Sequence, residues 1–499
     1  MCRKAKTLLF VLILQLIIPV TYAVDAQDKP AQTSVTSKEP ALSAAKGIPI
    51  SFDEAVQRMK VSNEAIIAAR FEEEQRVREK SAAFGLFFPK VDVKANGVKM
   101  SDPVVMDLND IRTAMLMVQQ GSLIGAGVNP AVANAINQQT ANNLPEFKKT
   151  LVEDKFMTVD ATVTQPIFTG GKILAANRAA DARVTETHQK LVDTQNRLIT
   201  ELVNRYFGYR LALKVVEVRK MVYDGMEKHL SDAKSLEKNG MIAHVECLHA
   251  EVAFSEADRE YRKALRNSEL ALTVLNNTLG GNDPVVPASP LFILNEIKPL
   301  EYYRNTALEN NPLLKQIGAS RELAHQNYMK ELSAYSPDIF VFGTRQLYEW
   351  HSPEYMPKWV VGFGATCTLF DGFADTNKVR AAQSQQERVA SLESKAKKDI
   401  CTLVEKNYQE LMLAHEQFQS IQTSYKFAEE YLRVREKAFV EGSATSLDVV
   451  DAQLAFAKVR IDKLKAAYDF DVALGALLEA SGQSGLISQY MSDHEEVEF

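Results

Sequence analysis

The chain has 499 residues, of which 46% are hydrophobic and 24% are charged, and its formal net charge is −6. This mild acidity, without a basic patch, excludes nucleic acid as an evident partner. The three cysteines after the N-terminal segment are an odd number, too sparse for a disulfide framework.

The N-terminus predicts an export signal. Arg3, Lys4 and Lys6 precede the apolar run LLFVLILQLIIPV, and a cleavage site of small residues follows. We therefore expect a signal peptide over 1–23 and a flexible segment over 24–48, because the latter is rich in Ser, Thr, Pro and Ala without apolar periodicity. No later run reaches the roughly 20 apolar residues of a spanning helix.

The rest of the chain contains a tandem repeat. Its aligned pairs at a shift of 202 positions include Phe168 with Phe370, Tyr206 with Tyr408, Tyr223 with Tyr425, Gly240 with Gly442, and Phe254 with Phe456. Upstream, Asn63 matches Asn311 at a shift of 248, so the first copy carries an insertion of 46 residues. Because one register holds without a gap from Phe168 to Gly280, we interpret the pattern as a duplication.

Both copies predict the same order of elements. Repeat 1 (49–280) comprises a helix over 52–85, a β-hairpin over about 88–168 with an inserted loop over about 100–155, a long helix over about 171–237, a turn near 240 and a return helix to 280. A connector (281–299) leads to repeat 2 (300–482), which has a helix over 300–335, a hairpin over about 338–370, a long helix over about 373–439, a turn near 442 and a return helix. A C-terminal tail follows (483–499). The side chains of Thr169 and Asp371 are expected to cap the long helices, whose length favours coiled-coil packing.

The hairpins alternate between apolar and small or polar residues. TVDATVTQ (158–165) and WVVGFGATCTLF (359–370) follow this period of two, which is common in soluble sheets and is also typical of outer-membrane strands. Trp350 and Trp359 flank the second hairpin's turn, where an aromatic belt at a membrane interface would place them. Four strands cannot close a barrel, and lipid does not tolerate open sheet edges, so several chains would share one barrel.

Three stretches resemble the TolC-like outer membrane efflux protein family: FDEAVQRMKVSNEAIIAAR, TQPIFTGGKILAANRAA and VEGSATSLDVVDAQLAF. The resemblance implies a mostly α fold with membrane β structure. A homotrimer would form a twelve-stranded β-barrel, four strands per protomer, continuous with a long periplasmic α-helical barrel. It also implies a passive exit duct in the cell outer membrane that extends into the periplasm and serves a tripartite efflux or type I secretion system. Its partners would be a periplasmic adaptor (membrane fusion) protein, an inner-membrane pump of the RND or ABC type, and outer-membrane lipid.

The resemblance also implies roles for residues near the two glycine breaks. Gly240 and Gly442 would form the turns at the periplasmic tip, where Asp448 and Asp451 match the family's ring of acids at the channel constriction. Glu246 occupies the equivalent position after the first break. Repulsion within such a ring would raise carboxyl pKa values unless hydrogen bonds or cations compensate. The tyrosine and arginine that latch the family's tip are replaced by Phe439 and Ala444, so other contacts must close it here.

Other functions find weaker support. His244, Cys247 and His249 could bind zinc, but their spacing converges poorly on one helix face, so we expect no metal site. The methionines in AMLMVQQ (114–120) are interpreted as loop packing rather than a copper path. No catalytic motif or cofactor fingerprint is present, which favours a protein that is not an enzyme and has no cofactor. A soluble periplasmic coiled-coil structural or adaptor protein is the alternative.

Overall fold

The computed structural model describes residues 47–351, 357–492 and 495–496. The predicted signal peptide and nearly all of the predicted flexible segment lie outside these residues. Within the described part of the chain, none of the helices combines the length and the apolar character that crossing a membrane requires.

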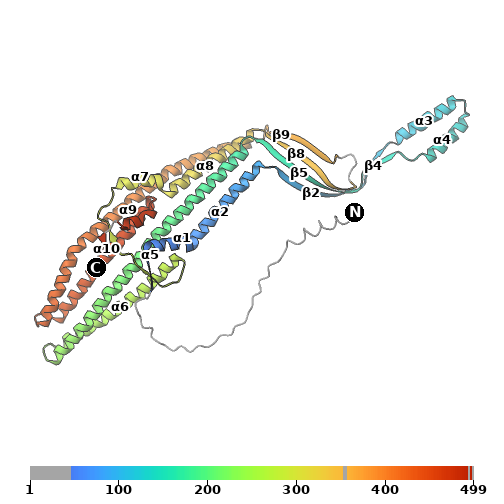
Figure 1. Ribbon diagram of the computed structural model, residues 1–499. Coiled ribbons are helices and arrows are strands. Elements are labelled where there is room, and N and C mark those ends of the chain that lie inside the picture. Colours follow the sequence, from blue (N-terminus) through green and yellow to red (C-terminus); the bar gives the residue numbers. More distant parts are fainter. Residues whose placement is uncertain (1–46, 352–356, 493–494, 497–499) are drawn as a thin grey trace, which may run out of the picture. The chain divides into compact units, whose positions relative to one another are not determined.

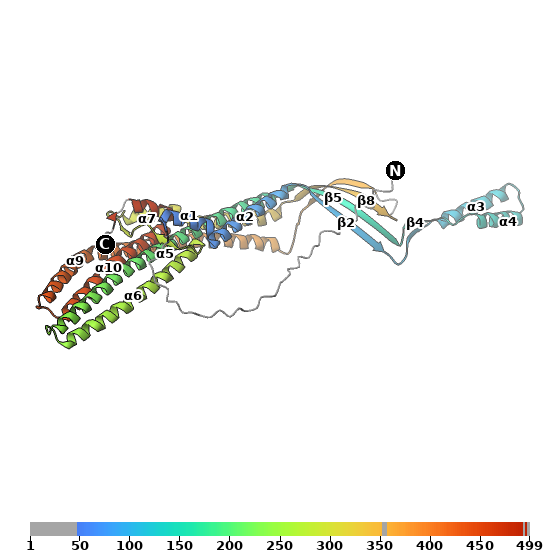
Figure 2. The ribbon, with the colours of Figure 1, turned by 60° about the horizontal axis from the view of Figure 1, so that its bottom comes forward.

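Two long helical hairpins dominate the structure (Figure 1). In the first repeat, α5 (Lys172–Lys238) packs against α6 (His244–Leu279), and in the second, α9 (Ala374–Val440) packs against α10 (Ser446–Ala480). Helices α5 and α9 both have 67 residues, which corresponds to rods of about 100 Å. The two hairpins lie side by side, since α10 also contacts α5 and α6 (Figure 2).

The α5–α6 pair packs as a coiled coil. Ala250, Ala257 and Ala264 follow one another at seven-residue spacing on α6, and all three are buried. A heptad of small residues keeps one face of a helix against its partner and allows a close approach. The expectation of coiled-coil packing is therefore confirmed for this hairpin.

The prediction of one continuous helix at the start of each repeat is wrong, because two shorter helices form there in each case. In repeat 1, α1 (Phe52–Ser62) and α2 (Glu64–Phe84) meet at Asn63, and in repeat 2, α7 (Leu300–Asn310) and α8 (Pro312–Leu332) meet at Asn311. Each asparagine has an extended backbone, and its side-chain oxygen accepts a hydrogen bond from the backbone N–H two residues later. An N-cap asparagine thus ends one helix and starts the next.

The two asparagines also form equivalent hydrogen bonds in the two repeats. Asn63 Nδ2 donates to the carbonyl oxygen of Thr278 at 3.0 Å, and Asn311 Nδ2 donates to that of Ala480 at 2.9 Å. Thr278 and Ala480 are 202 positions apart, whereas the asparagines are 248 apart. The two repeats therefore use the same interaction, and the difference between the shifts is the inserted segment.

The predicted caps of the long helices are also displaced. The N-cap positions are Gly171 and Phe373, both with a left-handed backbone and neither with a capping side chain. Thr169 and Asp371 lie two residues earlier, where their side chains still accept hydrogen bonds from the backbone N–H groups of Ile173 (3.4 Å) and Asp375 (2.7 Å). Each strand-to-helix connection is thus two residues longer than expected, and the residue at the N-cap has a left-handed backbone.

One four-stranded antiparallel sheet links the two repeats, in the order β2 (Lys90–Lys99), β5 (Lys155–Thr169), β8 (Asp338–Trp350) and β9 (Trp359–Thr366). Strand β5 pairs with β8 across the repeats, so the first and second predicted hairpins form one sheet. Among the described residues, β2 and β9 each pair on one side only. The sheet therefore has two open edges in the single chain.

The inserted segment, expected as loop and short helix, contains two helices and also two strands that were not expected. It forms a two-stranded ribbon of β3 (Val104–Asp107) with β4 (Lys148–Val152), which carries the helices α3 (Asn109–Gly125) and α4 (Pro130–Asn143). Asn129 caps α4 and Pro130 occupies its first turn, a standard start signal that the analysis of the sequence overlooked. This segment is called the α3–α4 hairpin below.

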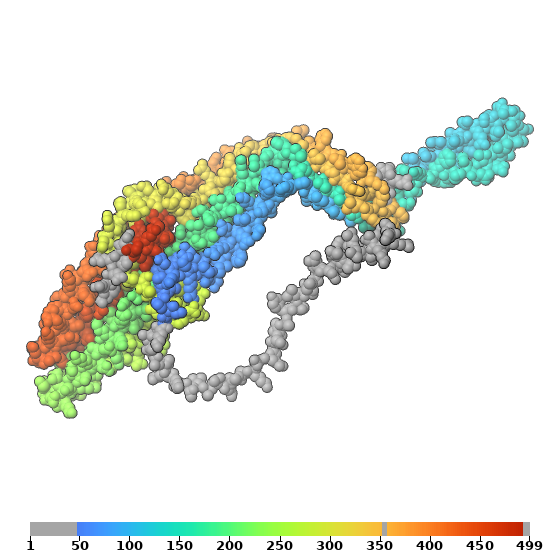
Figure 3. All heavy atoms as spheres, in the orientation of Figure 1, coloured from blue at the N-terminus to red at the C-terminus, as the bar shows by residue number. Residues whose placement is uncertain are grey.

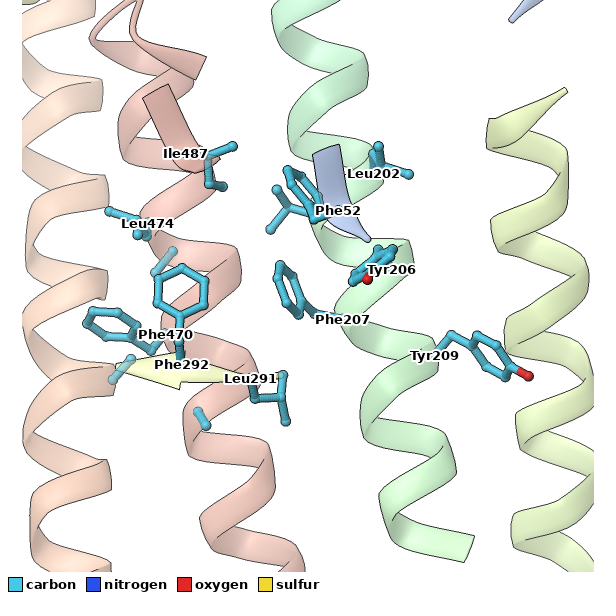
Figure 4. Close-up of a cluster of buried hydrophobic side chains, with 14 of the residues drawn as sticks. Phe52, Leu202, Tyr206, Phe207, Tyr209, Leu291, Phe292, Phe470, Leu474 and Ile487 are labelled. Atoms are coloured by element: carbon cyan, nitrogen blue, oxygen red, sulfur yellow. The ribbon is translucent and has the colours of Figure 1, made fainter. Parts of the chain in front are cut away.

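The largest buried cluster lies where the ends of the described chain meet the middle of the long helices (Figure 4). Phe52 from α1 packs on Tyr206 and Phe207 of α5, with ring centroids 5.4 and 5.7 Å apart, and Phe207 contacts Phe292. Tyr206 donates its hydroxyl proton to the Ile50 carbonyl oxygen at 2.7 Å. Burying these rings contributes about 2 kcal/mol per side chain.

Short strands complete this cluster. Strand β1 (Ile48–Ile50) pairs with β6 (Val285–Pro287), and β7 (Phe292–Ile293) pairs with β10 (Glu495–Glu496). Thus the predicted connector at 281–299 forms part of the core rather than only a link. The predicted tail also contributes, since Ile487 at the start of α11 (Ile487–Ser492) is buried. Figure 3 shows the α1 and α11 regions, blue and red, side by side on the surface.

Candidate functional site at the helical turns

The two helix reversals share one backbone design. After α5, Gly240 has a φ of 68°, and the Met241 N–H donates to the Leu236 carbonyl at 2.9 Å. After α9, Gly442 has a φ of 75°, and the Ser443 N–H donates to the Ala438 carbonyl at 2.8 Å. A left-handed residue followed by this six-to-one bond ends a helix in a Schellman motif, for which glycine is the favoured residue.

Asp448 has a structural role at the start of α10. Its Oδ2 accepts hydrogen bonds from the Thr445 N–H (2.9 Å) and hydroxyl (2.8 Å), while Thr445 Oγ1 accepts from the Asp448 N–H (3.2 Å). This is a capping box. The Thr445 backbone and hydroxyl, with a smaller effect from the charge of Arg435, hold the pKa of the Asp448 carboxyl below its usual range. In one chain, these hydrogen bonds therefore favour the charged form of the Asp448 carboxyl.

Three helices converge on Ser446, the first residue of α10. His229 Nε2 from α5 lies 2.6 Å from Ser446 Oγ, and Glu246 Oε2 from α6 accepts a hydrogen bond from the Ser446 N–H at 3.3 Å. The ring of Phe439, near the end of α9, lies 4.7 Å from the imidazole. We call His229, Glu246, Phe439 and Ser446 the tip cluster. It ties both helical hairpins together at their turns.

The tip cluster is closed to solvent around an ionisable group. His229, Phe439 and Ser446 are all buried. Burial lowers the pKa of the His229 imidazole, and the charges of Asp232 and Glu246 oppose this shift only in part. The imidazole is therefore neutral at neutral pH, so its hydrogen bond to Ser446 involves no buried charge.

Neither His229 nor Ser446 is among the site residues predicted from the sequence. The sequence placed Phe439 at the family's tyrosine position and Glu246 at the constriction. In the structure, Glu246 reaches across to the N-terminus of α10, where a carboxylate also interacts favourably with the helix dipole. A buried histidine on α5 cannot be paired with a serine 217 positions later from sequence spacing alone.

The first turn uses the equivalent positions differently. His244 Nδ1 lies 2.6 Å from Glu237 Oε1, and these residues precede Ser446 and Phe439 by 202 positions. Hydrogen bonds from His244 and Cys247 lower the pKa of Glu237. Among the described residues, no group of three or more His, Cys, Asp and Glu side chains is arranged to hold a metal ion. His244 forms a link across its own turn instead.

Asp451 differs from Asp448. It is exposed on α10, and its carboxylate forms no hydrogen bond or ion pair with another described residue. Arg435 Nη1, by contrast, lies 3.7 Å from Asp448 Oδ1. Of the two aspartates, only Asp451 has a carboxylate without a partner among the residues that the structure describes.

The sheet has two chemically different faces. Aligned residues across the strands place Val91, Val163, Gly343 and Val361 on one face, and their alternating neighbours Asp92, Thr162 and Thr344 on the other. Thr162 and Thr344 form a cross-strand hydrogen bond at 3.1 Å. Valines and Phe363, which is 83% exposed, leave the apolar face uncovered in the single chain.

The two tryptophans lie at different levels of this sheet. Trp359 pairs with Arg345, five positions before Trp350 on β8, which corresponds to about 17 Å along the strand. Trp350 instead pairs with Met157 and stacks on His351 with ring centroids 4.5 Å apart. Both residues are exposed near the second hairpin's turn, but they do not form one row.

Comparisons with known proteins agree with this architecture. The profile of a family described as "Outer membrane efflux protein" matches residues 125–281 and 303–483. None of the curated proteins matches the sequence. Among solved structures, a membrane protein from Pseudomonas aeruginosa is similar at 13% identity, with 90% of this chain and 96% of that chain covered and a TM-score of 0.68.

Two further structures show the same fold. The Campylobacter jejuni CmeC outer membrane channel is 15% identical, with 95% of this chain and 98% of that chain covered and a TM-score of 0.66. The outer membrane protein VceC from Vibrio cholerae is 12% identical, with 86% and 96% covered and a TM-score of 0.65. The likeness therefore extends over nearly the whole length of each.

Proposed function

The chain belongs to the outer membrane efflux protein family, and from this premise we propose that three copies assemble into one passive exit duct. Four strands from each copy would form a twelve-stranded barrel in the outer membrane, and the helical hairpins would form a tube in the periplasm. The duct would receive its cargo from an inner-membrane pump of the RND or ABC type through a periplasmic adaptor protein. The alternative of a soluble periplasmic adaptor is not favoured, because the family match covers both repeats.

The open sheet is the observation that supports this assembly most directly. Strands β2 and β9 expose their unpaired edges, and one face of the sheet carries exposed valines and Phe363. In lipid, an unpaired edge costs several kcal/mol for each unsatisfied backbone group. Pairing β2 of one copy with β9 of the next removes both edges at once, and the polar face with Thr162 and Thr344 then lines the duct.

We further propose that the turns form the periplasmic end of the duct and that the tip cluster holds it closed. The buried contacts of His229 with Ser446 and Phe439 join the two helical hairpins of one chain, and Phe439 and Ala444 occupy the positions where the family has its latch of tyrosine and arginine. Asp451 is the aspartate available to line the constriction, because the carboxylate of Asp448 is engaged in the capping box. The constriction would then consist of one Asp451 from each copy.

Native mass spectrometry of the protein extracted in mild detergent tests the assembly. We expect a trimer that inserts into planar bilayers as a channel and that requires detergent or lipid to remain in solution. A monomer in mild detergent, or a protein that is soluble without detergent, would exclude the shared barrel and revive the adaptor alternative.

A further inference from the structure

The α3–α4 hairpin has an unusual composition for an exposed helical pair. Residues 113–145 contain no Asp, Glu, Lys, Arg or His, whereas charges return at its base with Asp107, Asp110, Glu146 and Lys148. Soluble surfaces usually carry roughly a quarter to a third charged residues. The hairpin therefore lacks the chemistry of a surface that faces water all round.

Polar side chains link the two helices of the hairpin, beside the buried Ala133. Between α3 and α4, Gln119 Nε2 donates to Thr140 Oγ1 at 3.2 Å, Asn137 donates to Gln120, and Gln120 contacts Asn134. Arg112 closes the base by donating to the Leu144 carbonyl oxygen at 3.0 Å. Amides thus hold the helices to each other, which leaves the large apolar side chains on the outside.

Five of these apolar side chains lie on one face, whereas Met117 and Ile124, which are 64% and 43% exposed, lie on another side of α3. On α3, Ile111, Met115 and Val118 follow the i, i+4, i+7 spacing and are 53%, 57% and 72% exposed. On α4, Val132 and Ile136 are four positions apart and are 51% and 38% exposed. At about 100° per residue, each stripe lies about a quarter turn from the side that faces the other helix. In this antiparallel pair both stripes point the same way, so the five residues form one apolar face.

We propose that this apolar face packs against the same face of the other copies of this chain, which joins the hairpins into a six-helix cap. The inference rests on the proposed trimer. The chain connections and the lack of charge indicate that another copy of this chain covers the apolar face. The hairpin continues β2 and β5 through the β3–β4 ribbon, and β2 is an edge strand, which in the proposed trimer would pair with a neighbouring copy. The base of the hairpin thus lies at the boundary between copies.

The absence of charge favours identical partners. Side chains that face a threefold axis meet copies of themselves or of their near neighbours, so any charge on a face that points to the axis would be repeated at short distance. Like charges in contact destabilise an interface, and a face without charges avoids this cost. The cap would cover the end of the barrel opposite to the long helices, because α5 and α9 leave the sheet from the other ends of β5 and β9.

Site-directed crosslinking tests the packing. In a background in which Cys247, Cys367 and Cys401 are replaced by alanine, Val118→Cys introduces one thiol on the apolar face, and Gln138→Cys introduces one on the opposite, exposed face as the matched control. With a short bis-maleimide added to intact outer membranes, we expect covalent dimers of the Val118→Cys protein. These dimers would contain at most about two thirds of the chains, because three equivalent thiols allow one crosslink per trimer. The Gln138→Cys protein should stay uncrosslinked.

A second measurement does not depend on cysteine chemistry. Val118→Glu places three carboxylates on the proposed contact face and should lower the temperature at which the trimer dissociates, while Gln138→Glu should leave it unchanged. A trimer by native mass spectrometry that shows equal crosslinking at both positions and equal tolerance of both glutamates would overturn the cap. Labelling of Val118→Cys by a lipid-soluble reagent instead of crosslinking would assign the face to lipid and would also overturn it. A monomer would reject the proposed assembly itself.

Discussion

His229 Nε2 lies 2.6 Å from Ser446 Oγ, and this contact joins the C-terminal part of α5 to the first turn of α10. The two residues are 217 positions apart and both are buried. The hydrogen bond therefore couples the two helical hairpins at the turns where we place the closed end of the duct.

The first prediction concerns the pH response of this contact. Because burial lowers the pKa of His229, the unfolded or opened tip binds a proton more readily than the closed tip. The closed tip is thus fully stable above about pH 6.5, the ordinary histidine pKa, and loses stability as pH falls below it. We expect residues 441–450 to exchange hydrogen faster at pH 5.5 than at pH 7.5, after correction for intrinsic rates.

A matched variant distinguishes the protonation of His229 from the effects of low pH on other groups. His229→Gln keeps a side chain that can hydrogen bond to Ser446 but cannot titrate in this range, so its exchange should be nearly independent of pH. His188→Gln, which removes an exposed histidine paired with Glu73 on another part of the chain, should leave the response intact. An equal pH response in the wild type and in His229→Gln would show that His229 does not control the tip.

The second prediction separates the two aspartates. Asp451→Asn should reduce the preference of the channel for cations without changing thermal stability, because its carboxylate has no partner within the described chain. Asp448→Asn should instead lower the melting temperature, since it disrupts the capping box, and Thr445→Ala should cost about 1 kcal/mol for the same reason. Bilayer recordings and thermal melts of the same preparations measure both. Unchanged selectivity in Asp451→Asn would remove this residue from the constriction.

The third prediction compares glycines with the same backbone but different surroundings. Gly482 and Gly442 both have positive φ, 73° and 75°, so replacing either by alanine strains the backbone by about 1–2 kcal/mol. A Cβ on Gly482 would also lie 2.8 Å from the Asn310 carbonyl oxygen, whereas a Cβ on Gly442 would meet open space. Gly482→Ala should therefore lower the melting temperature more than Gly442→Ala. Equal shifts would mean that α10 moves away from Asn310 without cost.

The fourth prediction uses the buried carboxyl of Asp471 on α10. Burial raises its pKa well above the usual range, and the Phe292 backbone N–H opposes this only in part. The stability that comes from holding this group neutral is complete below about pH 4 and is lost as pH rises towards the raised pKa. Asp471→Asn should therefore raise the melting temperature at pH 8 relative to the wild type. Asp462→Asn, at an exposed site on the same helix, serves as the control, and similar behaviour of the two variants would contradict the assignment.

Much of the architecture could be read from patterns that repeat along the chain. The shift that aligns Tyr223 with Tyr425 also aligns Phe254 with Phe456, and the structure shows the same ring contact in both copies, at 5.2 and 5.6 Å. The 3.6-residue and two-residue periods distinguish helices from strands, because each period keeps one face against a neighbour. The order of elements and the likeness to outer membrane efflux proteins follow from such local signals.

Tertiary structure alone decided the features that depend on distant partners. Asn63 ends a helix because its side chain reaches Thr278 as well as its own following turn. Glu246, which the sequence places at the constriction, also accepts a hydrogen bond from the Ser446 N–H, because the first turn lies beside the second. His229 joins the two hairpins only because folding buries it beside Ser446. Burial there also lowers the pKa of its imidazole. Sequence spacing reports which residues share one helix face, but it carries no information on which faces of separate helices meet.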